Sequence, residues 1–244
     1  MLPTLVMILI ATFVVSLASL IGIFFISLRG TRKLQETIDY TVSFAIGALL
    51  STVFCGMLHH LVEEGFGYKL VIVGILLSLL IEKIIHWRHH HGLPSKEKPF
   101  GYINLIGDAL HNFVDGFVIA SSFLVSLSLG FITTLSIIFH EIPQEIGDFF
   151  VLLKAKFTIK KALLFNFLVA LTAILGSLFG YFVGVGIKGI LPYMIAIGAG
   201  NLLYIAMTDL MPEIIEEDSK KEFATKTILM IIGLLIVYYT IRVL

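Results

Sequence analysis

Apolar runs of about 20 residues recur along the whole chain, and they limit the available folds more than any other feature. An α-helix needs a run of this length to cross a bilayer. The 17 basic and 17 acidic residues among 244 lie mostly between the runs, and 58% of residues are hydrophobic. A mean hydropathy of +1.00 excludes the soluble globular class. We therefore predict an all-α integral membrane protein, one transmembrane domain over 1–244, with eight helices at roughly 2–28, 40–58, 68–87, 102–126, 129–153, 162–185, 190–211 and 225–243.

Positive charge is divided unevenly between the two sides of this bundle. Of the 17 Lys and Arg residues, 14 lie in or beside the loops after the first, third, fifth and seventh runs, and only Lys69, Lys188 and Arg242 lie on the other side. Cytoplasmic loops carry the excess of Lys and Arg, so we expect these loops in the cytosol and both termini outside. The formal net charge of zero gives no reason to expect a nucleic acid partner.

The run at 102–126 carries a polar stripe that lipid should not tolerate. We take about 100° per residue, from 3.6 residues per turn, and measure from His111. The other polar side chains then fall at about 20°, 40°, 60° and 100°, in the order Asn104, Asp115, Asp108 and Asn112. They form one narrow face of a helix.

A second stripe lies on the run at 129–153. Measured from His140, its members fall at about 40°, 80°, 100° and 140°, in the order Gln144, Asp148, Glu141 and Glu145. The loop around Ser128–Gly130 is long enough only for a tight hairpin, so the two stripes can face each other. Pro143 removes one backbone hydrogen bond of this helix and frees the carbonyl of Phe139.

The two stripes hold five carboxylates, which would be very unfavourable against acyl chains. An ionised residue at a helix centre costs roughly 2.5–3.5 kcal/mol on the lenient insertion scales, so five would cost on the order of 10 kcal/mol. Water, a bound cation or both must offset this cost. Imidazole favours zinc, iron or nickel and carboxylates accept nearly any divalent ion, so the mixture predicts a divalent transition metal site.

Other polar residues leave two readings open. Asn201 and Asp209 in the run at 190–211 are either part of a cytoplasmic exit path or interfacial caps. The cytoplasmic loop at 86–100 is either a metal-capturing segment or a flexible solvated one, and its candidate ligands are His86, His89, His90 and His91.

Two motifs carry a family resemblance. HNFVDG at 111–116 and HEIPQEIGD at 140–148 together resemble the paired signature of the ZIP (Zrt/Irt-like) divalent-metal transporters, in the branch whose fifth helix reads HExPHExGD. AGNLLYIAMTDLMPE at 199–213 and the eight runs extend the resemblance over nearly the whole chain. The two-part signature is specific, although neither half alone would be.

The resemblance implies a carrier that moves zinc, or alternatively Fe²⁺, Mn²⁺ or Cd²⁺, toward the cytosol, without an organic cofactor. It also implies a homodimer and an elevator-like movement of helices 1, 4, 5 and 6 against helices 2, 3, 7 and 8. The short loops favour a prokaryotic cell (inner) membrane.

By position, the resemblance places His111, Asp115 and His140 at one metal and Asn112 with Glu141 toward a second. Gln144 stands where the family has a histidine or a bridging carboxylate, so the number of bound ions, one or two, stays open. The remaining stripe residues are expected to line the pathway or support the ligands, namely Asn104, Asp108, Glu145 and Asp148, together with Asn201 and Asp209.

Two other functions fit parts of the pattern. HEIPQ at 140–144 is one substitution from the HExxH signature of zinc proteases, but Gln144 replaces the second histidine ligand and Pro143 disturbs the helix. Chains of acids and histidines also build proton relays, which keeps a passive cation or proton channel as an alternative. We expect a transporter and not an enzyme.

Overall fold

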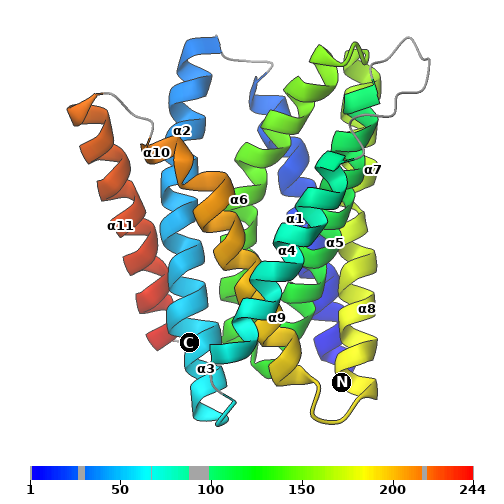
Figure 1. The fold of residues 1–244 in the computed structure, drawn as a ribbon, viewed down its shortest axis with the longest axis vertical. Coiled ribbons are helices and arrows are strands. Elements are labelled where there is room, and N and C mark those ends of the chain that lie inside the picture. The colour runs from blue at the N-terminus through cyan, green and yellow to red at the C-terminus, as the bar shows by residue number, and fades with distance from the viewer. Residues whose placement is uncertain (1, 27–30, 67, 88–98, 216–218, 244) are drawn as a thin grey trace.

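The computed structural model describes residues 2–26, 31–66, 68–87, 99–215 and 219–243. Eight helical rods make up this described part (Figure 1), and four of them consist of two or more consecutive helical segments. Their bounds are α1 Leu2–Ile26; α2 Thr31–Ser51 with the π-helical η1 Thr52–Met57 and α3 Leu58–Glu63; the 3-10 turn η2 Tyr68–Leu70 with α4 Val71–Trp87; α5 Pro99–Val125; α6 Leu127–Lys154; α7 Ile159–Ala170 with α8 Thr172–Gly186; α9 Leu191–Tyr204 with the π-helical η4 Ile205–Leu210 and α10 Pro212–Ile215; and α11 Lys220–Val243.

The predicted all-α architecture with eight helices is confirmed, and the main differences lie at helix ends. The second helix was predicted from residue 40, but α2 already begins at Thr31. The last helix was predicted from residue 225, and α11 begins at Lys220. Both extensions consist mainly of polar residues. The prediction followed the apolar runs, and it therefore began each helix too late. Polar residues with good helix propensity can extend a helix beyond its apolar run wherever water covers the helix end.

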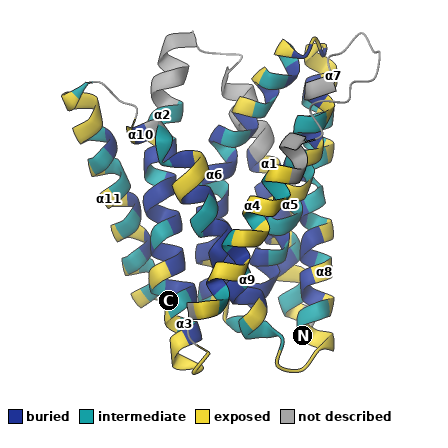
Figure 2. Ribbon diagram, in the orientation of Figure 1, coloured by how far each residue is buried: buried dark blue, intermediate teal, exposed yellow. Residues whose placement is uncertain are grey.

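Within the described residues, four helices are both long and apolar enough to cross a membrane, namely Ile38–Glu63, Ile159–Gly186, Leu191–Leu210 and Lys220–Val243. The outer surface fits the same environment (Figure 2), because large apolar side chains such as Leu76 and Leu80 on α4 are more than half exposed. In water, a soluble monomer rarely exposes so much contiguous apolar surface. The two striped helices are also long, at 27 residues for α5 and 28 for α6.

Both chain termini lie at the same end of the bundle (Figure 1), while α2, α5, α7 and α11 start at the other end. Only Ser126 separates α5 from α6, and its hydroxyl caps α6 by accepting a hydrogen bond from the Leu129 N–H at 3.1 Å. This turn makes α5 and α6 an antiparallel hairpin, as the short loop predicted.

Glycines bring three pairs of helices into backbone contact. A Cβ on Gly116 of α5 would lie 1.8 Å from the Ala173 carbonyl oxygen of α8, and one on Gly176 of α8 would lie 1.8 Å from the Phe113 oxygen of α5. The same reciprocal arrangement joins α2 to α11 and α4 to α9, through Gly47 with Gly233 and Gly74 with Gly200. Small residues allow this close approach, so the backbones of these pairs lie against each other.

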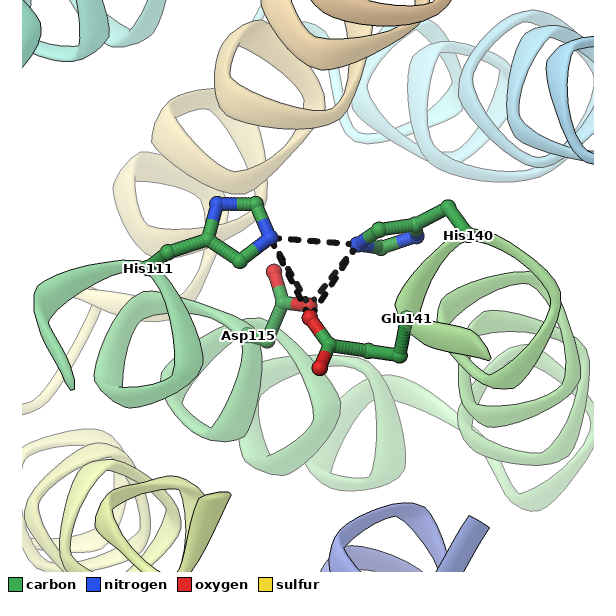
Figure 3. A group of neighbouring side chains, drawn as sticks. All are labelled: His111, Asp115, His140 and Glu141. Atoms are coloured by element: carbon green, nitrogen blue, oxygen red, sulfur yellow. Dashed lines mark hydrogen bonds and ion pairs between the residues drawn. The ribbon is translucent and has the colours of Figure 1, made fainter. Parts of the chain in front are cut away.

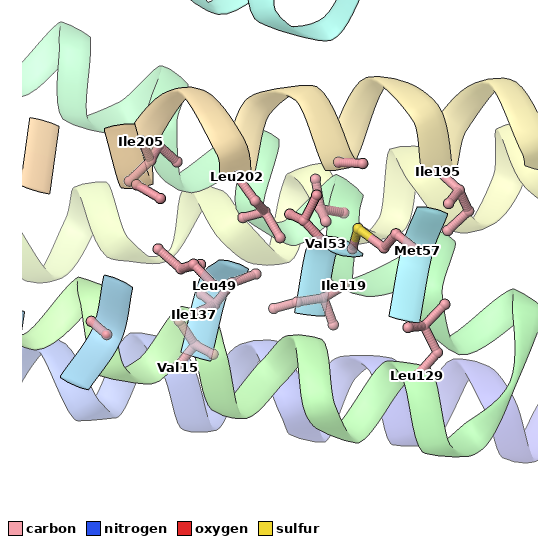
Figure 4. Close-up of a cluster of buried hydrophobic side chains, with 14 of the residues drawn as sticks. Val15, Leu49, Val53, Met57, Ile119, Leu129, Ile137, Ile195, Leu202 and Ile205 are labelled. Carbon is pink, nitrogen blue, oxygen red and sulfur yellow. The ribbon is translucent and has the colours of Figure 1, made fainter. Parts of the chain in front are cut away.

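The largest hydrophobic cluster includes the half of the bundle nearest the termini, and a smaller one around Leu105 and Leu152 lies at the opposite end. Figure 4 shows side chains from α2, η1, α5, α6 and α9 meeting there. Met57, Ile119 and Ile137 have no exposed surface, and Leu129 and Ile195 pack in the same cluster. This packing places apolar side chains between the termini end and the polar stripes of α5 and α6.

Candidate metal centre

The two stripes meet near the midpoints of α5 and α6. His111 and Asp115 are one turn apart on α5, and they face His140 and Glu141 of α6 (Figure 3). One ligand atom from each of the four side chains lies within 4.8 Å of the other three. The hairpin at Ser126 causes this meeting, because it runs α6 back along α5 with the polar faces together.

The distances within this cluster suit a small cation. His140 Nε2 lies 3.0 Å from Asp115 Oδ2, and His111 Nε2 lies 3.2 Å from Glu141 Oε1. The two Nε2 atoms are 3.3 Å apart. Tetrahedral zinc with bonds of about 2.0–2.1 Å separates its ligand atoms by about 3.3 Å. The four side chains therefore already have nearly the spacing of a four-coordinate zinc site.

Burial makes a positive charge necessary here. Asp115, His140 and Glu141 have no exposed surface, and the His111 side chain is 16% exposed. All four carboxylate oxygens of Asp115 and Glu141 are buried and accept no well-directed hydrogen bond. A buried carboxylate is strongly unfavourable unless it is paired with a cation. The nearby imidazoles or a metal ion can supply that charge.

Neighbouring groups hold these ligands in place. Nδ1 of His140 lies 3.3 Å from the Ser136 carbonyl oxygen, one turn earlier in α6. Such a contact to the second ring nitrogen orients a metal-ligating imidazole, and here it directs Nε2 toward the cluster.

A cavity of about 230 Å³ begins at His111 and extends through the half of the bundle opposite the termini. Its described walls include the second half of α4, the first half of α5 and the end of α9 with η4. Gln144, Asn201 and Asp209 are on these walls. His111 is therefore the member of the cluster that connects it to open space.

The other predicted ligands have amide side chains. Asn112 is buried, and its amide N–H₂ donates to Asp108 Oδ1 at 2.8 Å. Gln144 lines the cavity. Glu145 is buried, and its backbone oxygen accepts a hydrogen bond from Asn166 at 3.1 Å.

The other predicted pathway residues lie along the cavity. Asn104 donates to Asp148 Oδ1 at 2.8 Å, which links α5 to α6. The Asn201 amide oxygen accepts a hydrogen bond from Ser78 at 2.9 Å. Asp209 is exposed. In the cytoplasmic loop, His89, His90 and His91 lie outside the described residues, as does the side chain of His86.

Sequence reasoning did not place Glu82 and Tyr204 on the cavity wall, where the structure has them. The Tyr204 hydroxyl donates a hydrogen bond to Glu82, which joins α4 to α9. One signal was present, because a carboxylate inside an apolar run marks a functional position by default. The tyrosine had no such signal.

Comparison with known proteins agrees with this geometry. Residues 94–240 match the family described as ZIP zinc transporter. The chain belongs to the ZIP zinc transporter family. Similar ZIP proteins include "Zinc transporter ZIP13" of Pongo abelii, 32% identical over 221 residues that cover 80% of this chain and 64% of that protein. "Zinc transporter ZIP10" of Homo sapiens is 37% identical over 149 residues, covering 56% of this chain and 18% of that protein.

A third ZIP relative, "Zinc transporter ZIP6" of Homo sapiens, is 42% identical over 115 residues that cover 47% of this chain and 15% of that protein. The chain thus spans about two thirds of the ZIP13 relative and less than a fifth of the other two. All three are named as zinc transporters and not as enzymes. All three are eukaryotic, so they give no support to the expected prokaryotic membrane.

Proposed function

We propose that the chain carries zinc, or a similar divalent transition metal, across the membrane into the cytosol, and that His111, Asp115, His140 and Glu141 hold the ion. The observation that carries this proposal is the cluster itself: two imidazoles and two carboxylates, buried near the middle of two helices, with ligand atoms within 4.8 Å of one another. A carrier needs a site that replaces the hydration shell of zinc, and four such ligands do so.

The direction of transport is taken from the family resemblance, and the position of the cavity indicates which side of the membrane the site faces. The cavity extends from His111 toward the end of the bundle at which the loops rich in Lys and Arg are predicted. These loops are cytoplasmic by the positive-inside rule, which places both termini outside. On the outer side the apolar core around Ile119 and Ile137 covers the site. The structure is then an inward-facing state, in which a bound ion has access to the cytosol.

The contacts between helices indicate which of them would move together as the carrier changes between its outward-facing and inward-facing states. Gly116 and Gly176 fix α5 to α8, and the Ser16 hydroxyl of α1 donates to the Ala170 oxygen of α7 at 2.8 Å. We infer that α1, α5, α6 and α7–α8 move together, and that the pairs α2–α11 and α4–α9 form the other body. The four ligands lie on α5 and α6, so they would travel as one unit.

Four ligand atoms within 4.8 Å of one another are enough for one bound ion. Asn112 donates its amide N–H₂ to Asp108 and Gln144 lines the cavity beside His111, and the number of bound ions, one or two, stays open. Iron, manganese and cadmium suit the same four ligands and are alternative substrates. The homodimer and the single domain over 1–244 stay predictions from the resemblance and the sequence.

Uptake of radioactive zinc into proteoliposomes tests the proposal. His111→Ala and His140→Ala should each reduce saturable uptake at least 10-fold, because each removes one of four ligands. His59→Ala is a matched control, since His59 is an exposed histidine on α3 that pairs with Glu63 at 3.2 Å. Wild-type uptake by both ligand variants would refute the assignment, and uptake that does not saturate with zinc would favour a channel.

A further inference from the structure

The cavity beyond the four-residue cluster is strongly negative. It is lined by four carboxylates from four different elements, and no Lys or Arg is among the described residues of its walls. These carboxylates are Glu82 on α4, Asp108 on α5, Asp148 on α6 and Asp209 on η4. A cavity with one sign of charge and low-dielectric walls concentrates ions of the opposite sign.

Two of these carboxylates, Asp148 and Asp108, accept hydrogen bonds from asparagine amides. The Asn104 amide donates to Asp148 Oδ1 at 2.8 Å, and the Asn112 amide donates to Asp108 Oδ1 at 2.8 Å. Asn104 and Asp108 are four residues apart on α5, so they are neighbours on one face of the helix. Asp148 of α6 therefore meets the face of α5 that carries Asp108, and both residues line the cavity.

The hydrogen bonds from the two asparagine amides leave other oxygen atoms free to bind a cation. Asp108 is 5% exposed and its Oδ2 atom accepts no hydrogen bond. Asn112 has no exposed surface and its Oδ1 atom is also without a donor. A buried charged oxygen without a donor is strongly unfavourable, and the amides that could donate are already committed to the other carboxylate oxygens.

We propose that Asp108 and Asp148, supported by the amide groups of Asn104 and Asn112, form a second cation site that is made of oxygen atoms and takes a hard divalent ion such as Mg²⁺, Ca²⁺ or Mn²⁺. Such ions prefer carboxylate and carbonyl oxygens as ligands, whereas zinc also binds imidazole nitrogen well. On α5 this site begins one turn before His111, and it differs from the four-residue cluster in having no nitrogen ligand. It goes beyond the proposed transport function, since a cation can bind here whether or not the chain carries zinc.

Manganese binding to the full chain in nanodiscs of neutral lipid tests this site. The chain is first loaded with one equivalent of zinc, and Mn²⁺ is then titrated while electron paramagnetic resonance follows the free ion. We expect one bound Mn²⁺ per chain, whose spectrum lacks the strong coupling of a directly bound imidazole ¹⁴N. This measurement needs no variant. Absence of bound Mn²⁺, or strong ¹⁴N coupling, would overturn the proposal.

Paired substitutions give the second test. Asp108→Asn and Asp148→Asn should each weaken Mn²⁺ binding at least 10-fold, because each removes a charged oxygen and keeps the side-chain shape. Glu222→Gln is the matched control, since Glu222 is an exposed carboxylate on α11, and it should bind Mn²⁺ as wild type. Unchanged Mn²⁺ binding in both Asp variants would refute the site. In the His111→Ala/His140→Ala chain, Mn²⁺ binding should persist while zinc uptake is lost, which separates this inference from the proposed function.

Discussion

Replacing Gly116 by alanine should separate α5 from α8 and disturb the metal cluster with them. The new Cβ would lie 1.8 Å from the Ala173 carbonyl oxygen. Normal van der Waals contact requires the two helices to move apart by about 1.5 Å. Neither partner can give way locally, because the obstacle is helix backbone and not the end of a flexible side chain. Overpacking of this kind costs about 1–3 kcal/mol, and occasionally more.

The same displacement reaches the ligands. Asp115 precedes Gly116 directly, and its contact of 3.0 Å with His140 joins α5 to α6. A misplacement of about 1 Å can reduce the rate of a reaction that depends on geometry about 100-fold. We therefore expect Gly116→Ala to lower zinc uptake 10-fold or more, and to lower the melting temperature by about 2–4 °C for each kcal/mol lost.

Gly147→Ala is the matched control for stability, since a Cβ at Gly147 on α6 meets no atom within 4 Å. Alanine is the better helix former by about 0.5–1 kcal/mol, so this variant should be as stable as wild type or slightly more so. Melting of the purified proteins in detergent and zinc uptake in proteoliposomes measure both effects. If Gly116→Ala melts and transports like wild type, the close approach of α5 and α8 does not exist.

Further predictions concern a cavity residue and a buried ion pair. Gln144→His should tighten zinc binding about 10-fold, because it adds an imidazole to the cavity wall beside His111; unchanged affinity in calorimetry would show that position 144 does not reach the ion. Lys226 is 4% exposed and its Nζ lies 3.4 Å from Asp39 Oδ2, so Lys226→Ala should destabilise the α2–α11 pair by about 3–5 kcal/mol. Removal of both charges in Asp39→Asn/Lys226→Met should restore part of that loss in thermal melts, and a double variant less stable than the single one would contradict the ion-pair explanation.

Helical periodicity predicted much of the fold and of the site. The eight apolar runs and a short loop were enough to predict the bundle and the facing of α5 and α6, although the loop was predicted around Ser128–Gly130 and the structure has it at Ser126. The angles of side chains about the helix axis also identified His111, Asp115 and His140 as candidate ligands. These features depend only on the length of a run and the direction of a side chain about its own helix axis, both of which are local.

Which residues belong to the site depends on more than the direction in which each side chain points from its own helix axis. On the wheel, Glu141 lies about 100° from His140, yet its Oε1 atom lies 3.2 Å from His111 Nε2 and belongs to the cluster. A wheel does not describe where the neighbouring helix axis lies or how far a side chain reaches. For the same reason Tyr204 could not be predicted, because its place on the wall depends on how α9 crosses α4.

All four members of the metal cluster come from a single hairpin, within the 31 residues from His111 to Glu141. If this cluster is the transport site, one short segment supplies all four of these ligands. A chimera that exchanges only the α5–α6 hairpin, which also forms part of the cavity wall, would then be expected to inherit the donor's preference for an ion.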